Sequence, residues 1–329
     1  IGAEVKQILS ELMGNDDANK QNLFINPEGG TVNGCYPKLR PIEAINWLKR
    51  NAFDDGTPFY FFESLNYNEG DPENKKGGLV FNSHKNLIKL TEDQLKAGKF
   101  DSGLREFSMN PYGHGQDQGE DEFNRSRWVL GISTNLGMSK FNQIPRGAYG
   151  STLTTVDIAT KTVEEKPFEY GTPEEMRSLN KFKPFATEGL AKNFDKPLNE
   201  YQGRRYYSSI NSLGMGDKGN YHFSLEKGSD YLQRAMAIKE NLKYMQHEME
   251  IYGDFTLFPG AIIKLNFPKA ADAEAMKAGE YRDELQSGIY LITRINHIFK
   301  NNEYRMKVSI AKDSSNLDLD SKTPAIEKV

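Results

Sequence analysis

The chain has 329 residues, of which 37% are hydrophobic and 27% charged, an ordinary globular composition that allows two or three modest cores. Its formal net charge of −4 argues against a dedicated nucleic-acid binder, because such domains carry clustered Lys and Arg that release counterions. The single cysteine, Cys35, excludes an internal disulfide and a multi-cysteine zinc site, and no apolar stretch approaches the roughly 20 residues that cross a bilayer.

The N-terminal third alternates helical and extended patterns. Residues 3–13 place apolar side chains at the i, i+3, i+4, i+7 spacing of one helical face, and 42–53 carry a second apolar stripe. The aromatic run at 58–63 predicts a strand buried on both faces, with 78–81 pairing back onto it. Region 1–100 is therefore expected to form a small α/β unit.

The middle of the chain changes character. Within 101–168, β-branched and apolar runs predict strands at 128–132 and 150–158. The stretch 169–228 is dense in Gly, Asn, Lys and Pro, which indicates an irregular insertion without a large core of its own. A helix is expected at 229–243, where apolar residues again share one side.

The C-terminal part has the clearest pattern, because apolar and polar residues alternate with a period of two. Four antiparallel strands are expected, at 244–252, 261–267, 287–299 and 303–311. The last two flank Lys300, Asn301 and Asn302, an Asn-rich turn that tolerates positive φ. Helix formers at 270–279 predict a short decorating helix. The side chains expected in the barrel interior are Met249, Ile263, Ile295 and Val308.

These patterns predict an α+β fold in which a small α/β domain precedes an antiparallel tail-tube-like β-barrel interrupted by an irregular, partly helical insertion. Strands from the middle region are expected to help to close the barrel. The expected divisions are the α/β domain (1–100), the first part of the barrel (101–168), the insertion (169–243), the second part of the barrel (244–312) and a flexible tail (313–329).

The sequence nominates no catalytic, cofactor-binding or metal-binding residue. Five histidines are scattered along the chain and none forms a helical H-E-x-x-H pair, and there is no Gly-x-Ser-x-Gly elbow or Walker-type phosphate loop. The glycine-rich 214–219 neither follows a strand nor opens a βαβ unit, so an ordinary loop is expected. Cys35 has no motif around it that would make it a nucleophile.

Two groups of histidines have alternative interpretations. By strand alternation His247 and His297 point the same way as their apolar neighbours, which predicts core histidines with satisfied ring nitrogens. His114 with Asp117 and Asp121 could hold a cation, although the spacing does not match the calcium-loop pattern. The acidic run to which these aspartates belong is read as a solvated loop, with cation binding left open.

One run carries a family resemblance: Tyr252-Gly-Asp-Phe-Thr-Leu-Phe-Pro-Gly-Ala-Ile-Ile263. It resembles the strand–turn–strand element of the tail-tube-like barrels in baseplate hub proteins of T-even-type contractile phages. Pro259 and Gly260 are expected to reverse the chain, while Phe255 and Leu257 plug the end of the barrel. The order of the other elements is similar over most of the chain, with 169–228 poorly matched.

The resemblance implies a structural, non-enzymatic subunit of the virion tail baseplate, assembled in the host cytoplasm. Such hubs are homotrimers, related in architecture to late-control proteins and type VI secretion spike bases. Each subunit brings two barrels, whereas this sequence shows one, so a first barrel is expected to precede Ile1; without it, a hexamer becomes the alternative. The implied partners are the central spike protein, the tail tube or its initiator protein, the surrounding wedge proteins, and genomic DNA as transient non-specific cargo; no membrane and no cofactor are implied.

Two other classes of function stay open at the level of sequence. A tail-associated cell-wall hydrolase or peptidase would need converging titratable groups in a cleft, and the sequence nominates none. A receptor-binding or carbohydrate-binding module is compatible with the 16 Tyr and 19 Phe residues. Those aromatic residues lie mostly at alternating or helical core positions, which favours packing as their role.

Overall fold

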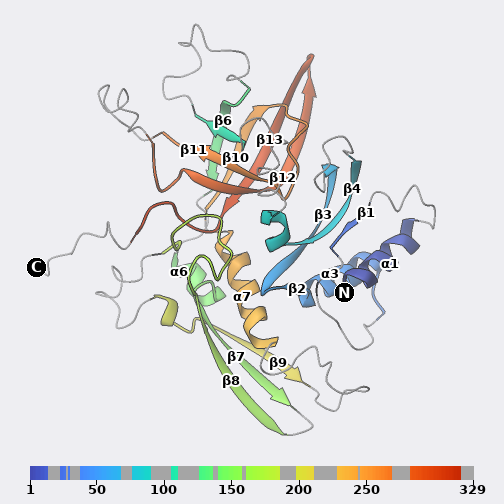
Figure 1. Ribbon diagram of the computed structural model, residues 1–329, viewed down its shortest axis with the longest axis vertical. Helices are drawn as coiled ribbons and strands as arrows, with labels where there is room; N and C mark the ends of the chain where they lie inside the picture. Colours follow the sequence, from blue (N-terminus) through green and yellow to red (C-terminus); the bar gives the residue numbers. More distant parts are fainter. Residues whose placement is uncertain are drawn as a thin grey trace, which may run out of the picture.

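The computed structural model describes residues 1–13, 23–26, 29, 38–67, 76–89, 105–109, 126–135, 140–157, 161–185, 198–210, 228–243, 245–268 and 282–319. In these residues the fold is mixed α+β, as predicted, with a four-stranded, a six-stranded and a three-stranded sheet grouped around one central helix (Figure 1). None of the described helices is long and apolar enough to cross a membrane. The expected helix at 270–279, the glycine-rich 214–219, Cys35, and His114 with its two aspartates lie outside the described residues.

The N-terminal unit confirms the predicted α/β arrangement. Helices α1 (Gly2–Met13) and α3 (Pro41–Asn51) pack on a sheet of order β1-β4-β3-β2. Its strands are β1 (Leu23–Ile25), β2 (Phe53–Asp54), β3 (Thr57–Tyr67) and β4 (Lys76–Ser83). Helix α3 begins at Pro41. Proline has no N–H group, and it suits the first helical position because an N–H there would have no partner within the helix. The Glu43 carboxylate accepts the N–H of Arg40 at 3.1 Å.

Strand β3 joins two cores, because its successive side chains point to opposite faces. Phe59 and Phe61 pack in the core under α1 and α3. Tyr60 and Phe62 pack against the core of the six-stranded sheet. The prediction that both faces of this aromatic run are covered is confirmed, and it explains why the strand has no polar face.

The six-stranded sheet has the order β5-β11-β12-β13-β10-β6 and is curled into a half-barrel. Its strands are β5 (Glu106–Ser108), β6 (Val129–Asn135), β10 (Met245–Tyr252), β11 (Ile262–Asn266), β12 (Gly288–Lys300) and β13 (Glu303–Lys312). Five neighbouring pairs are made, all antiparallel except β5 with β11. The two edge strands approach at a single bridge between Ser108 and Trp128, where the Ser108 N–H donates to the Arg127 carbonyl at 3.1 Å.

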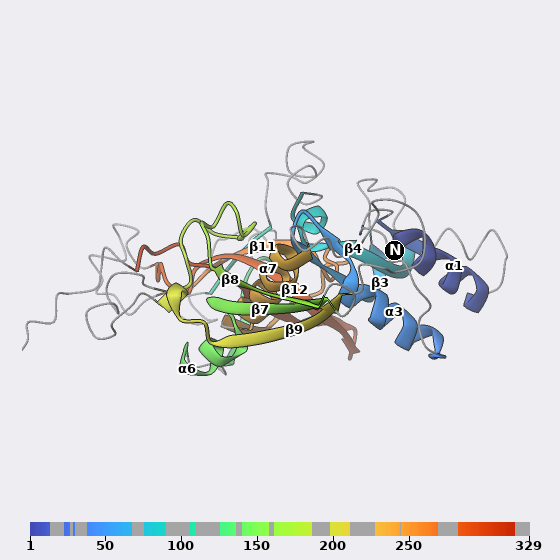
Figure 2. The ribbon, with the colours of Figure 1, turned by 90° about the horizontal axis from the view of Figure 1, so that it is seen from below.

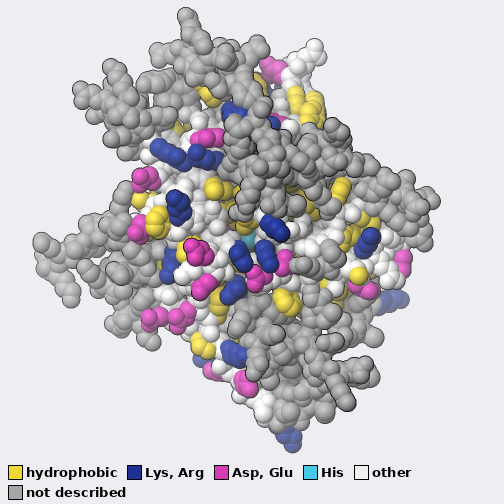
Figure 3. Space-filling model, in the orientation of Figure 1, with side chains coloured by type: hydrophobic (Ala, Val, Ile, Leu, Met, Phe, Trp, Pro, Cys, Tyr) yellow, Lys and Arg dark blue, Asp and Glu magenta, His cyan; other side chains and the backbone are white. Residues whose placement is uncertain are grey.

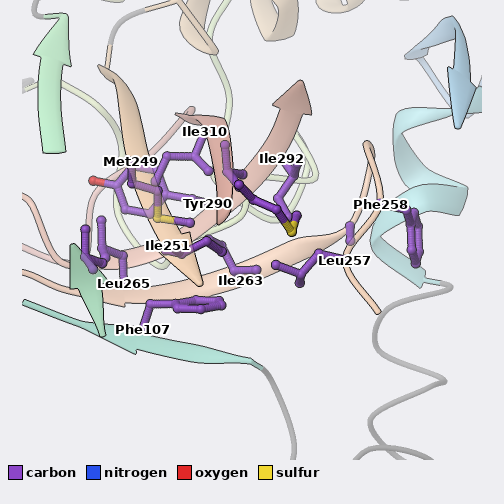
Figure 4. Close-up of a cluster of buried hydrophobic side chains, with 14 of the residues drawn as sticks. Phe107, Met249, Ile251, Leu257, Phe258, Ile263, Leu265, Tyr290, Ile292 and Ile310 are labelled. Atoms are coloured by element: carbon purple, nitrogen blue, oxygen red, sulfur yellow. The ribbon is translucent and has the colours of Figure 1, made fainter. Parts of the chain in front are cut away.

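The core of this sheet comes from the predicted alternation (Figure 4). Met249, Ile263 and Val308 are fully buried as predicted, whereas Ile295 is half-buried. At the predicted reversal, Gly260 has φ +91° and the Ala261 N–H donates to the Phe258 carbonyl at 3.1 Å, the geometry of a Pro-Gly type II turn.

A separate three-stranded sheet has the order β8-β7-β9. Its strands are β7 (Gly150–Asp157), β8 (Thr162–Glu169) and β9 (Arg204–Ile210). The strand expected at 150–158 exists, but its expected place in the barrel is wrong. It pairs antiparallel with β8 and parallel with β9, and these neighbours occupy both of its hydrogen-bonding edges. The region read as irregular thus supplies a strand, and it also contributes to a second core built from Tyr149, Tyr170, Met176, Phe185 and Leu198 together with α7.

Helix α7 (Gly228–Asn241), as predicted, leads into β10 and links the sheets. Gln233 donates to the Ser151 carbonyl of β7 at 2.9 Å, and Asn241 donates to the Ala148 carbonyl at 2.9 Å. The same helix also contacts β3 (Figures 1 and 2). Since both bonded side chains are buried, α7 is fixed against β7 by amide groups as well as by apolar packing.

Candidate interaction surface

The hairpin β12–β13 passes from the centre of the protein to its surface, and its two ends present different chemistry. At the end where the hairpin closes, Asn301 and Asn302 have φ 50° and 61°, as predicted for an Asn-rich turn. At the opposite end, the strands enter a buried polar cluster around Lys312 and Asp313.

The buried end contains the most strongly perturbed titratable groups near the barrel. Lys312 is almost fully buried and donates from Nζ to the carbonyls of Leu285 at 2.8 Å and Ser287 at 2.7 Å. Burial lowers the pKa of Lys312 to about 8. Burial also raises the pKa of the neighbouring Asp313 carboxyl, which accepts the Leu179 N–H at 3.1 Å.

His247 belongs to the same interior and is confirmed as a satisfied core histidine. It is 2% exposed, with Nδ1 at 3.0 Å from Thr134 Oγ1 and Nε2 at 3.2 Å from the Tyr290 hydroxyl. Burial lowers its pKa to about 4, so the ring is neutral at physiological pH. Its two hydrogen bonds join β10 to β6 and to β12.

A polar clamp closes this end of the hairpin. The Asn180 side chain both donates to and accepts from the backbone of Ile289, at 3.0 and 2.9 Å, and Phe182 and Ser315 exchange two backbone hydrogen bonds at 2.9 Å. The first residues of the expected flexible tail, Asp313 to Ser315, are consequently buried. These perturbed groups are shielded from water and their bonds are made to the protein itself, which fits a joint between segments and not a substrate site.

The opposite end is an exposed aromatic stack. Along the core-facing side of the hairpin, buried Val308 and Met306 are followed by Tyr304, which lies opposite Phe299 at the outer end. The rings of Tyr304 and Phe299 are 4.5 Å apart at an interplanar angle of 6°, and Phe255 lies 4.5 Å from Tyr304 at 27°. We call Phe255, His297, Phe299 and Tyr304 the aromatic ladder.

The two phenylalanine rings of the aromatic ladder are exposed to solvent, although large apolar side chains of this kind are usually buried. Phe299 is 66% exposed and Phe255 56%, and Figure 3 shows hydrophobic side chains gathered at this end of the hairpin. Leu257 is buried in the barrel, as predicted, but the prediction that Phe255 plugs the barrel end is wrong. Phe255 instead stacks on Tyr304 outside the barrel, because the core-facing side of the hairpin extends beyond the strands that cover it.

His297 also departs from its prediction. It shares a strand face with Ile295, as expected, but it lies half-exposed in the ladder and not in the core. Its Nδ1 is 2.7 Å from the Tyr304 hydroxyl, and its ring is stacked 6.1 Å from that of Phe255. Partial burial lowers the pKa of His297.

The chemistry that the ladder offers is apolar stacking, flanked by charge. Arg305 pairs with Glu250 at 3.1 Å and with Glu303 at 2.9 Å on the other side of the same strands. Within the described residues, no group of three or more His, Cys, Asp or Glu side chains could hold a metal ion. Period-2 alternation predicted which residues share the ladder's face, but it gave no signal for where the covering strands would end.

Comparisons with known proteins give structural likeness without a sequence match. No family model matches the sequence, and no curated protein matches it. Among solved structures, the fold is similar to that of the tail protein from Neisseria meningitidis MC58, with a TM-score of 0.42 and 9% identity. That alignment covers 95% of this chain and 66% of the other, so this chain spans a little under two-thirds of the length of the protein it matches.

Proposed function

We propose that this protein is a structural ring subunit of a contractile phage tail, placed in the baseplate hub between the tail tube and the central spike. The ring is a closed cyclic oligomer with the wedge proteins around it. A trimer is the preferred form, and a hexamer is the alternative. Genomic DNA passes through its centre as transient, non-specific cargo. Its work is assembly, and it catalyses no reaction.

The aromatic ladder is the observation that carries this proposal. Phe299 continues the core-facing side of the hairpin β12–β13 into solvent, Phe255 stacks beside it on Tyr304, and the apolar area of both rings stays exposed in the free chain. Aromatic residues are enriched in the buried centres of protein interfaces, and a large exposed apolar patch is unusual on a monomer. A subunit that spends its working life in a permanent assembly can keep such a patch because a neighbour covers it.

The sheet edges support the same proposal. Among the described residues, β8 and β9 each pair on one side only, and β5 and β6 approach each other at one bridge. Free edges present unpaired N–H and C=O groups that proteins normally cover or block. Neighbouring subunits placed side by side around a pore would cover them.

The charge of the chain fits a conduit for DNA. A lumen lined by Lys and Arg would release counterions and hold the strand, whereas neutral or acidic walls let it slide. The formal net charge of −4 is compatible with such walls.

Mass photometry followed by negative-stain electron microscopy of the purified chain tests the proposal directly. We expect rings with a central pore, and the double variant Phe255→Ser, Phe299→Ser is expected to shift the protein toward monomer while its melting temperature changes little. A wild-type protein that stays monomeric at high concentration and forms no ring in the phage particle would refute the proposed function.

A hydrolysis assay separates this proposal from the alternative of a cell-wall hydrolase or peptidase. The assembled protein is incubated with peptidoglycan and with peptide substrates, alongside the variants His114→Ala, His247→Ala and Cys35→Ala. We expect no turnover by any of them. Turnover that disappears with one of these substitutions would replace the structural function with an enzymatic one.

A further inference from the structure

The outer part of the hairpin β12–β13 has an open edge. Strand β11 pairs with β12 over Gly288–Leu291, and Ile292 makes two further backbone hydrogen bonds of 2.8 Å on that side. The register of β12 against β13 then shifts between Ile292 and Arg294. From Arg294 onward, β12 pairs with β13 alone among the described strands. We call Arg294–Lys300 the arm edge.

The backbone of the arm edge is arranged to accept another strand. In an antiparallel pair, alternate residues direct both their N–H and their C=O to the partner strand. The two-residue turn of the hairpin closes on the pair of Lys300 and Glu303, so Lys300 is one of the residues bonded to β13. By alternation, the backbone groups of Ile295, His297 and Phe299 point to the open edge. Such an edge binds an added strand through its main-chain groups.

The side chains of the arm edge are cationic and apolar. Arg294 and Lys300 are exposed, no carboxylate lies between them, and neither has an ion-pair partner in the described part of the chain. Ile298, which is 37% exposed, shares their face of the strand, and Phe299, which is 66% exposed, lies on the other face. A strand that fits this edge is therefore acidic and carries an exposed apolar side chain.

Strand β8 has these properties. It lies at the edge of its sheet and, of the strands that the structure describes, it pairs with β7 only. It carries three carboxylates against the single cation Lys166. Val163 is 63% exposed, and by alternation it shares a face with Glu165 and Glu169. Both carboxylates are exposed, and within the described residues neither forms an ion pair. Face-matched pairing would thus bring two cations to two carboxylates, with an apolar residue on each strand beside them.

The other strand edges fit the arm edge less well. The opposite edge of the same sheet is β9, which carries the exposed cations Arg204 and Arg205. Strand β6 has no charged residue, and β1, β2 and β5 have three residues or fewer. A second arm edge would place cations against cations. Charge on an edge repels strands of like charge and admits one of opposite charge, which selects β8.

One residue limits how far this pairing extends. Pro167 has no N–H, and proline in a sheet is found on edge strands with its nitrogen turned away from the neighbouring strand. We therefore expect the main-chain hydrogen bonds along Thr162–Lys166, where every residue has a backbone N–H. This length is comparable with that of the arm edge.

The arm edge and β8 lie far apart within one chain. In Figure 1 the arm points to the top of the view and the sheet of β7, β8 and β9 lies at the bottom, along the longest axis of the protein. The two strands also belong to different sheets. One chain therefore does not pair its own arm edge with its own β8, and the strand must come from another copy.

We infer that the arm edge of one subunit pairs with β8 of a second copy of this chain, so that two sheets join across the subunit boundary. Two complementary surfaces at different places on one molecule make a head-to-tail contact, and such contacts close into rings when the rotation between subunits allows it. This inference rests on the proposed ring and names the strands that hold it together.

Crosslinking identifies the partner strand. In a Cys35→Ser chain, the pair Ile298→Cys and Val163→Cys is treated with a short bis-maleimide, which tolerates a shift in register. We expect a ladder of covalent oligomers on a denaturing gel. The pair Ile298→Cys and Tyr207→Cys places the second thiol on β9, at a residue that is 72% exposed, and should stay monomeric. Crosslinking through Tyr207→Cys but not Val163→Cys, or through Ile298→Cys alone, would refute pairing with β8.

A second test removes one backbone donor from the open edge. His297→Pro and His297→Ala both lose the imidazole, but only proline loses the N–H that points away from β13. We expect the proline variant to associate at least about tenfold more weakly than the alanine variant, measured by mass photometry. Equal association would refute main-chain pairing. Should proline lower the melting temperature, the crosslinking result decides.

Charge exchange tests the selection of β8. The variants Arg294→Glu, Lys300→Glu and Glu165→Lys, Glu169→Lys should each assemble less than wild type at low salt. The quadruple variant, which exchanges the two signs, should regain most of the assembly. A quadruple variant that stays dissociated while both double variants fold would refute the charge pairing.

A matched control carries the same change in net charge elsewhere. Lys6→Glu, Lys38→Glu alters two exposed lysines outside both strands and should assemble like wild type. Failure of this inference and failure of the proposed function then give different results. If wild type forms rings but none of the variants weakens them, the strand pairing is refuted and the ring remains. A wild type that never assembles refutes the ring and, with it, this contact.

Discussion

The two ends of the hairpin β12–β13 share one pair of strands and one alternating pattern, yet they differ in environment. Near its buried end, Ile310 and Lys312 are enclosed, and even the charged amine finds two carbonyl acceptors. At the outer end, Phe299 is 66% exposed although it occupies the same core-facing side. The difference teaches that side-chain alternation assigns a face to a residue, whereas the length of the neighbouring strands decides whether that face is covered.

The largest effect should come from truncating the buried end. Ile310→Ala removes a fully buried side chain from the barrel core, and we expect it to lower the free energy of unfolding by about 2–5 kcal/mol. Urea denaturation followed by circular dichroism measures this. A loss under about 1 kcal/mol would mean that the barrel interior relaxes around the cavity and that the contrast between the two ends is weaker than the burial indicates.

The second effect is the pH dependence of the buried histidine. His247 binds a proton near pH 4 in the folded protein and near pH 6.5 in the unfolded chain, so acid favours the unfolded state. Its contribution is fully present above pH 6.5 and is lost as the pH falls toward 4, with a total of about 3 kcal/mol by linkage. His84, whose pKa is also lowered to about 4 by burial, adds a parallel loss.

Thermal unfolding measured from pH 7 to pH 4 checks this, with His247→Gln as the comparison. The variant should lose stability less steeply across that range, because one of the two histidine rings that are buried in the described part of the chain is gone. His297→Gln at the exposed end is the matched control and should change the slope less. Equal slopes for wild type and His247→Gln would contradict the assignment of His247 as a neutral core histidine.

Truncation at the outer end should affect stability much less than assembly. Phe299→Ala removes the close stack on Tyr304, which is worth about 0.5–1.5 kcal/mol, and a wider one on Phe255 at 6.2 Å. We expect a small fall in the melting temperature of the dissociated chain together with a clear loss of oligomer in mass photometry. A variant that loses stability as severely as Ile310→Ala would show that the ladder is part of the folding core.

The smallest effect concerns the closing turn. Asn302 has φ 61°, a conformation that glycine adopts without the penalty of a Cβ atom. Asn302→Gly is expected to be neutral or to stabilise by less than about 1 kcal/mol, whereas Asn302→Val should cost about 1–2 kcal/mol. Urea denaturation of the two variants, measured side by side, distinguishes this turn from one whose backbone relaxes to negative φ.

Much of the secondary structure was predictable because it depends on local chemistry. The helical stripes of α1, α3 and α7 were found from their spacing, and β10 to β13 were found from alternation. The reversals at Gly260 and Asn301 were predictable from residues that tolerate positive φ. The prediction was wrong about which strands pair with each other. Strand β7 pairs with β9, which lies more than 40 residues further along the chain, and not with the strands of the barrel.

The candidate surfaces show the same division. The sequence by itself determined that Phe299 and Tyr304 share the face of Val308 and that His247 points inward, because periodicity is a property of the chain. Only the tertiary structure decided that Phe255 stacks on Tyr304 outside the barrel and that β9 pairs with β7. Burial and long-range electrostatics depend on which distant segment covers a side chain, and no local pattern encodes that.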